Sequence, residues 1–125
     1  MLEEIRDDEH MIRAVWPKYI KDDGSISSAA FKPRQKESGV SVERTGDRPV
    51  PVAVLETKKL FSPESGLVSV SVLDCKAAKT YLVFDPRDNH PYHSQIYSTP
   101  EMTPLDPVQW YDLASRAVVR ISPSK

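Results

Sequence analysis

Valines recur at every second position in two segments of the chain, residues 39–44 and residues 67–72. Because successive side chains of a strand point to opposite faces, this alternation predicts two β-strands, each with one face toward a core. In the first segment, Val40 and Val42 are expected to point inward. The second segment follows a proline- and glycine-containing turn, which is the usual boundary of a strand.

Three more strand patterns lie in the second half of the chain. Residues 81–84 form a continuous apolar run, which is typical of a central strand buried on both faces. Residues 93–98 follow a polar loop, and a strand there would place the odd-numbered side chains on one face and the even-numbered ones on the other. Residues 118–121 predict a last strand.

A capping residue followed by proline marks the start of a helix at Asp106 and Pro107. Aspartate accepts a hydrogen bond from the first free amides of a helix, and proline at the first helical position has no amide that needs a partner. The apolar side expected for this helix comprises Val108, Tyr111, Leu113, Ala114 and Ala117.

Two other segments also have helical patterns. Residues 50–61 predict a helix with Val52 and Leu55 on its buried side, although the valines equally allow a strand. Residues 74–79 predict a short helix that Asp74 caps.

Short strands and helices in mixed order predict an α+β fold. With 125 residues, the chain suits a small single domain, here residues 13–125, with a mixed or largely antiparallel sheet and short helices packed on one side of it. The acidic residues 1–12 are expected to form a separate N-terminal segment, either a helix that frays or a partly ordered terminus.

Charge and cysteine content restrict the classes of function. The net charge is −1, so there is no global attraction to nucleic acid or to an anionic membrane, and no apolar run is long enough to span a bilayer. The single cysteine, Cys75, excludes an internal disulfide and is expected to be packed rather than reactive. The N-terminus does not have the pattern of a signal peptide. These features predict a cytoplasmic protein.

The candidate chemistry is concentrated in residues 85–97, which include His90 and His93. A histidine that titrates near neutral pH, beside arginine and tyrosine, suits metal-free acid–base chemistry on a phosphodiester or phosphoryl group. We therefore take His90 and His93 as catalytic candidates and Tyr92 as a ligand-binding candidate. The competing interpretation is that both histidines satisfy backbone groups in a loop and its adjoining strand.

Other segments would complete such a site if they converge on the histidines. Arg13 and Arg44 are candidates to bind an anion. Ser27 and Ser28, at the start of a short helical turn, would present hydroxyls and amides to the same anion, with Lys32 close by. Ordinary N-capping by the serines is the alternative.

No complete motif indicates a metal site or a cofactor. His90 and His93 are separated by Pro91, which disfavours the helix that would place both on one face. Neither a cysteine pair nor a third nearby histidine supports zinc, so we expect no metal and no cofactor.

The site pattern leaves three functions open, and none establishes an enzyme. The first is recognition of a small anionic or nucleotide-like ligand in a polar cleft. The second is a non-catalytic protein-interaction module that uses Trp110, Tyr111 or Tyr97. The third, single-stranded nucleic-acid binding, is disfavoured because nearby acidic residues dilute its basic surface, which comprises Arg34, Lys36, Arg44 and Arg48. The pattern does not determine an oligomeric state.

Three segments of the chain read Asp-Gly-Ser-Ile-Ser-Ser-Ala-Ala-Phe-Lys in residues 23–32, Ser-Val-Glu-Arg in residues 41–44 and Asn-His-Pro-Tyr-His-Ser in residues 89–94. In these segments the chain resembles a set of small bacterial hypothetical proteins. The resemblance covers about residues 13–98. It carries no assigned activity, so it implies neither a catalytic residue nor a cofactor.

Overall fold

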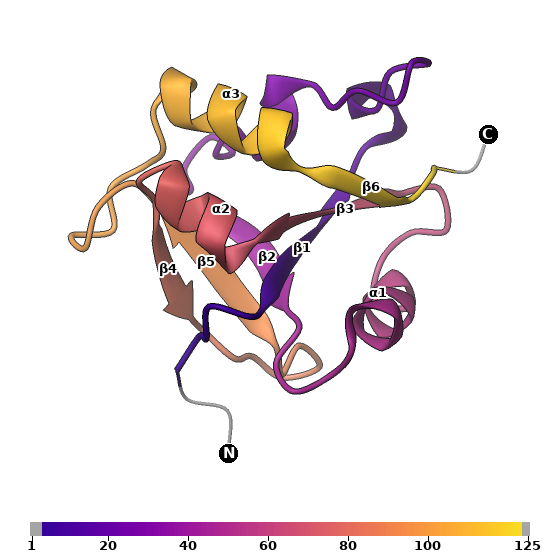
Figure 1. The fold of residues 1–125 in the computed structure, drawn as a ribbon, viewed down its shortest axis with the longest axis horizontal. Helices are drawn as coiled ribbons and strands as arrows, with labels where there is room; N and C mark the ends of the chain where they lie inside the picture. Colours follow the sequence, from indigo (N-terminus) through magenta and orange to yellow (C-terminus); the bar gives the residue numbers. More distant parts are fainter. Residues whose placement is uncertain (1–3, 124–125) are drawn as a thin grey trace.

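The computed structural model describes residues 4–123, which form one sheet with helices on both of its faces (Figure 1). The strand order is β4-β5-β2-β1-β3-β6, and every pair of neighbours is antiparallel. This confirms the α+β class and the largely antiparallel sheet. The strands are β1 (His10–Val15), β2 (Val40–Arg44), β3 (Gly66–Ser71), β4 (Tyr81–Phe84), β5 (His93–Tyr97) and β6 (Val118–Ile121), the α-helices are α1 (Val50–Lys58), α2 (Val72–Ala77) and α3 (Pro107–Arg116), and the 3₁₀ turns are η1 (Pro17–Tyr19) and η2 (Ser28–Phe31).

Strand β1 lies in the middle of the sheet, and its first three residues belong to the segment that was expected to be a fraying helix or a partly ordered terminus. Residues 4–9 form bends and turns rather than a helix, and Met1–Glu3 lie outside the described residues. The proposed boundary after residue 12 falls inside β1. Met11 and Ile12 are both buried, one on each face of the sheet. The alternation of apolar and polar residues that indicates a half-buried strand is therefore missing, and the sequence pattern did not predict β1.

Strand β4 is at an edge of the sheet, so the expectation of a central strand was wrong. Its neighbour is β5, and on its other side, within the described chain, no strand pairs with it. Only Leu82 packs against the main core, while Tyr81 is exposed. A run of four apolar residues therefore did not distinguish an edge strand from a central one.

Each face of the sheet carries its own apolar cluster. The main core lies between the sheet and η2, α2 and α3, and includes Met11, Phe31 and Leu113. The smaller cluster on the other face joins Ile12 and Leu67 to Ala53 and Val54 of α1. Helix α1 therefore packs opposite α2 and α3, and the expectation that all helices share one side was wrong (Figure 1).

Helix α1 forms where predicted but turns a different side inward. Ala53, Val54 and Thr57 are buried, whereas Val52 and Leu55 are exposed. Small residues allow the close approach of this helix to the sheet. The larger apolar side chains therefore misidentified the packed side.

Helix α3 starts as predicted, with Asp106 accepting a hydrogen bond from the Gln109 amide at 2.8 Å and the Gln109 side chain accepting one from the Asp106 amide at 3.0 Å. Its buried side contains Leu113 and Ala114, whereas Val108 and Tyr111 are exposed.

Helix α2 starts two residues before the predicted position. Its cap is the Ser71 hydroxyl, which accepts from the amide of Asp74, so Asp74 lies in the first turn instead of capping it.

The second face of the sheet, which carries α1, is only partly covered. Helix α1 packs on Ile12 of β1 and Leu67 of β3. Strands β1 and β2 pair only at Met11 with Arg44 and at Ile12 with Glu43, and beyond these pairs they separate. This fork, together with the face of β2 and β5 beside it, forms the hollow in which the candidate site lies.

Candidate functional site

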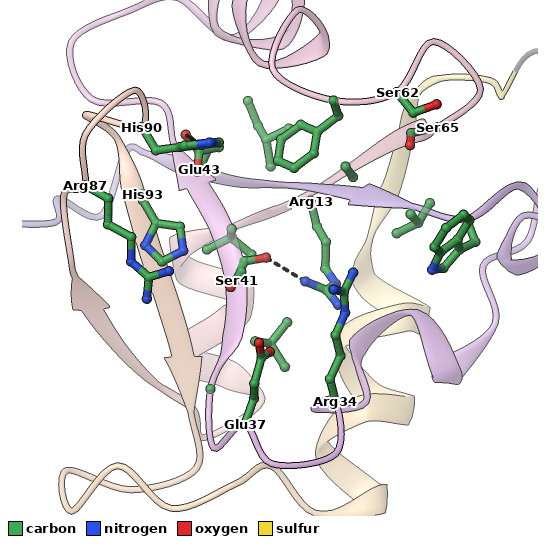
Figure 2. Close-up of a pocket in the computed structure, with 18 residues that line it drawn as sticks. Arg13, Arg34, Glu37, Ser41, Glu43, Ser62, Ser65, Arg87, His90 and His93 are labelled. Carbon is green, nitrogen blue, oxygen red and sulfur yellow. Dashed lines mark hydrogen bonds and ion pairs between the residues drawn. The ribbon is translucent and has the colours of Figure 1, made fainter.

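A cleft of about 390 Å³ opens at the fork of β1 and β2 (Figure 2). Its volume is in the range of sites that bind small molecules. The lining comes from β1, β2 and β5, from the loop before β5, and from the loops after η2 and α1. The lining includes Arg13, Trp16, Arg34, Glu37, Ser41, Glu43, Phe61, Arg87, His90 and His93.

His93 and His90 lie together at one end of the cleft, with ring centroids 6.5 Å apart and ring planes nearly perpendicular. His93 Nδ1 is 2.9 Å from the backbone oxygen of Asp85, so the tautomer with the proton on Nδ1 donates to that oxygen. Burial lowers the pKa of His93, which keeps its ring neutral at pH 7. His93 thus satisfies a backbone group, and its Nε2 remains able to accept a proton.

His90 lies beside a buried carboxylate that the sequence did not single out. Glu43 is only 3% exposed, and its Oε1 is 3.7 Å from His90 Nδ1, which is too far for a hydrogen bond. Burial raises the pKa of Glu43 against the opposing attraction of His90. Within the described chain, His90 Nδ1 is buried and has no hydrogen-bond partner. A buried carboxylate with a perturbed pKa in a cleft is a frequent mark of a functional site.

The register of the sheet is what brings Glu43 to the histidines. Glu43 of β2 is directly opposite His93 of β5. In the sequence, the alternation of residues 39–44 indicated only that Glu43 lies on the polar side of its strand. The contact between Glu43 and the histidines depends on the pairing of β2 with β5. The sequence contains no signal for this pairing.

Arg87 lies next to His93 in the cleft (Figure 2), and Asp85 holds its guanidinium in place. Asp85 Oδ2 accepts hydrogen bonds from Gln95 Nε2 at 3.0 Å and from Arg87 Nη2 at 3.0 Å. These hydrogen bonds lower the pKa of Asp85, and the bond from Gln95 has the larger effect. The aspartate therefore remains charged at neutral pH and keeps the Arg87 guanidinium close to His93.

Two arginines reach the other end of the cleft. Arg13 crosses the fork, where its Nε donates to the Ala30 oxygen and its Nη1 to the Ser41 oxygen, both at 2.6 Å. Figure 2 shows the guanidinium groups of Arg13 and Arg34 ending in the same part of the cleft. Burial and then the positive charge of Arg34 lower the pKa of Arg13 to about 10, so it is still a cation at pH 7.

Of the residues predicted for the site, Arg13, His90 and His93 line the same cleft. Ser27 and Ser28 line a separate hollow against α3. Ser27 caps η2 by accepting from the Ala29 amide, as the alternative interpretation expects. The predicted convergence of the serine turn with the histidines is therefore not observed.

Lys32, Arg44 and Tyr92 are outside this cleft as well. Lys32 lies over the Trp110 ring at 5.3 Å, and Arg48 lies over the Tyr92 ring at 3.5 Å. These side chains therefore contact protein groups rather than the hollow.

Arg44 is fully buried on the opposite face of the sheet. Its Nε and Nη2 donate to the two carboxylate oxygens of Glu9 at 2.8 and 2.6 Å. The guanidinium also lies 4.5 Å from the centre of the Phe84 ring. This bidentate pair joins β2 to the segment before β1 and has a structural role, since no ligand can reach it.

The aromatics considered for a protein partner differ in accessibility. Trp110 packs against the main core and its indole donates to the Leu105 oxygen at 3.0 Å. Tyr97 is buried, whereas Tyr111 is 71% exposed. Trp110 is thus not the centre of an exposed apolar patch, while the histidine cleft is open.

Within residues 4–123, no group of three or more His, Cys, Asp and Glu side chains is placed to hold a metal ion. None of the helices described is long and apolar enough to cross a membrane. Comparison with protein-family models, curated proteins and solved structures finds no significant match to this chain.

Proposed function

We propose that the protein binds a small organic anion in the cleft at the β1–β2 fork, and that nucleotide-like compounds fit it best. The observation that carries the proposal is the lining: three arginines, Arg13, Arg34 and Arg87, share one hollow with the two histidines. Two carboxylates, Glu37 and Glu43, also line it. The balance of charge therefore favours an anion.

The arginine end explains why an anion would be held there. Arg13 already donates to two backbone oxygens, and the nearby charge of Arg34 repels it. In the described chain, no carboxylate forms an ion pair with Arg34. An oxyanion between the two guanidiniums would accept charge-assisted hydrogen bonds and remove their repulsion.

Aromatic side chains support a nucleotide-like ligand over inorganic anions alone. Phe61 and Trp16 line the cleft, and both are exposed. The Phe61 ring centroid is 6.0 Å from that of His90. A planar base can stack on such surfaces, which contributes on the order of 1 to 3 kcal/mol for each base.

Anion binding is tested by titrating phosphate and adenosine monophosphate into the protein and following the amide resonances by NMR. Arg34→Gln is expected to weaken both ligands about tenfold or more, since a hydrogen bond to a charged group contributes about 1.5 to 3 kcal/mol. Lys36→Gln is the control, because it removes an exposed cation two residues away that does not line the cleft. Equal losses in the two variants, or no saturable binding to the native protein, would contradict the proposal.

We also infer a cytoplasmic location from the cysteine chemistry. Cys75 is buried as a free thiol, and burial raises its pKa to about 12. The prediction that it is packed is confirmed, and a chain whose single cysteine rules out an internal disulfide is typical of a reducing compartment.

A further inference from the structure

We propose that residues of the cleft catalyse the cleavage of a ribonucleotide phosphodiester, with His93 as the proton acceptor and His90 as the proton donor. The inference rests on the proposed anion-binding function and names its substrate class. It starts from the juxtaposition of the two imidazoles beside Arg87, with each Nδ1 turned toward a protein oxygen. The neighbouring 2′-hydroxyl of such a substrate is its own nucleophile, so the reaction needs no further reactant.

His93 has the features of the base. The hydrogen bond of Nδ1 to the Asp85 oxygen at 2.9 Å holds the ring and leaves the lone pair on Nε2. Burial keeps the ring neutral at pH 7 because it lowers the pKa of His93. A neutral imidazole lining the cleft can take the proton of a hydroxyl brought within hydrogen-bond reach.

His90 has the features of the acid, with Glu43 as its positioning residue. The Glu43 carboxylate is 3.7 Å from Nδ1, on the side of the ring where no hydrogen bond is formed in the described chain. A small rotation would close this gap, and such contacts commonly tighten when substrate binds. The carboxylate would then orient the ring, balance the charge of its protonated form and leave the proton on Nε2 for the leaving oxygen.

The two rings are close enough to act on the same phosphoryl group. They lie edge to face with centroids 6.5 Å apart, so a phosphoryl group bound over the pair would be within reach of both imidazoles. Arg87, held by Asp85, lies beside the His93 ring and would stabilise the charge that develops on the phosphoryl oxygens. Phe61 next to His90 offers a surface on which a base stacks.

The chemical step balances without a metal, an oxidant or water. His93 Nε2 takes the proton of the 2′-hydroxyl while that oxygen forms a bond to phosphorus. The bond between phosphorus and the 5′-oxygen breaks, and this oxygen takes the proton of His90. The products are a 2′,3′-cyclic phosphate and a 5′-hydroxyl, and proton exchange with solvent restores the two imidazoles.

The test uses the dinucleotide uridylyl-adenosine and its 2′-deoxy analogue, in the presence of EDTA. The native protein is expected to cleave the ribonucleotide and not the deoxy analogue. His93→Gln and His90→Gln are each expected to lower kcat/KM about 100-fold, the usual contribution of a positioned acid or base. His10→Gln, prepared in the same way, is the matched control, since His10 does not line the cleft, and it should retain full activity.

Glu43→Gln separates a positioning role from a structural one through the pH profile. For the native protein, kcat/KM should follow a bell-shaped curve between pH 5 and 9, because one imidazole must be neutral and the other protonated. Glu43→Gln should shift the alkaline limb, since the charge that balances protonated His90 is gone. A merely structural effect would lower the curve without moving either limb.

Three results would overturn the inference: no cleavage by the native protein, equal cleavage of the deoxy analogue, or undiminished activity in His90→Gln. If a histidine variant does not fold, a flat pH profile of kcat/KM for the native protein would also overturn the inference. Phosphate titration of the native protein and of Arg34→Gln tests anion binding independently of cleavage. Normal phosphate binding without cleavage would leave the anion site standing and refute the catalytic step alone.

Discussion

At the scale of single residues, Glu43 is the clearest conflict between stability and function. A carboxylate that is 3% exposed has lost most of its hydration, and within the described chain it is compensated by His90 at 3.7 Å rather than by hydrogen bonds. The contrast with Glu9 is direct, because that buried carboxylate accepts hydrogen bonds from Arg44, Arg6 and Gly46, which lower its pKa in spite of burial. Glu9 is therefore built to stabilise the fold, whereas Glu43 is held at a cost that a ligand or a proton would relieve.

The pH dependence of stability should show this cost. The pKa of Glu43 is raised in the folded state, so the folded protein holds the proton more tightly than the unfolded chain. Its contribution to the free energy of unfolding therefore falls as pH rises above about 4.5, the ordinary value, toward the raised folded value. Glu43→Gln is expected to gain on the order of 1 kcal/mol at pH 7 and nothing at pH 4. Urea unfolding of the two proteins at both pH values measures the difference, and a loss of stability at pH 7 would refute it.

At the scale of elements, the fork between β1 and β2 makes the site. Two residue pairs hold the strands together at one end, and at the other the Arg13 side chain takes the place of a strand partner by donating to the Ser41 oxygen. Helix α1 packs beside this fork through small side chains, which leaves β2 and β5 uncovered. The site exists because one helix covers only part of a sheet face and an arginine side chain bridges the gap between β1 and β2.

The packed side of α1 can be tested with two matched truncations on neighbouring residues. Val54 is 6% exposed and Leu55 is 63% exposed. Val54→Ala removes two buried methyl groups and should lower the free energy of unfolding by about 1.5 to 2 kcal/mol. Leu55→Ala removes more atoms but should change stability by less than about 0.5 kcal/mol, because those atoms are in water. Chemical denaturation decides this, and a larger loss in Leu55→Ala would mean that the helix packs through the side predicted from its larger apolar residues.

At the scale of the whole molecule, the sheet has a protected centre and two exposed edges. Strand β1 is bonded to β3 along its length and to β2 at the closed end of the fork. Strands β4 and β6 are edges with one partner each in the described chain. Apolar clusters on both faces meet at β1, through Met11 on one side and Ile12 on the other. The last residues of the expected N-terminal extension are thus part of a central strand of the fold.

Amide hydrogen exchange should reproduce this order. The amides of β1 and β3 are expected to exchange at least about tenfold more slowly than those of β4 and β6, since local opening of an edge strand exposes little of the core. NMR detection of exchange after transfer to deuterated solvent resolves the strands separately. Equal protection of β4 and β1 would show that the sheet opens as one unit. That result would contradict the expectation that β4, as an edge strand, opens separately from the centre of the sheet.

Sequence patterns by themselves determined most of the elements. Alternating valines located β2 and β3, the Asp106–Pro107 pair located the start of α3, and the order of strands and helices led to the α+β class. These features are local, because the period of side chains along a strand and the caps of a helix depend only on neighbouring residues. The histidine segment was also recognised locally, as a concentration of reactive side chains after a strand.

Tertiary structure alone decided how those elements are ordered and which side chains meet. Strand β1 was not predicted because burial of both of its faces removes the alternation of apolar and polar residues. The edge position of β4 was not predicted because no local property distinguishes an edge strand from a central one. Arg44 was as plausible as Arg13 for the anion, until alternation along the two strands and pairing with Glu9 placed it on the far face. Glu43 joined His90 and His93 through strand register, a long-range property. Proximity between distant segments is set by packing, and a single sequence does not record it.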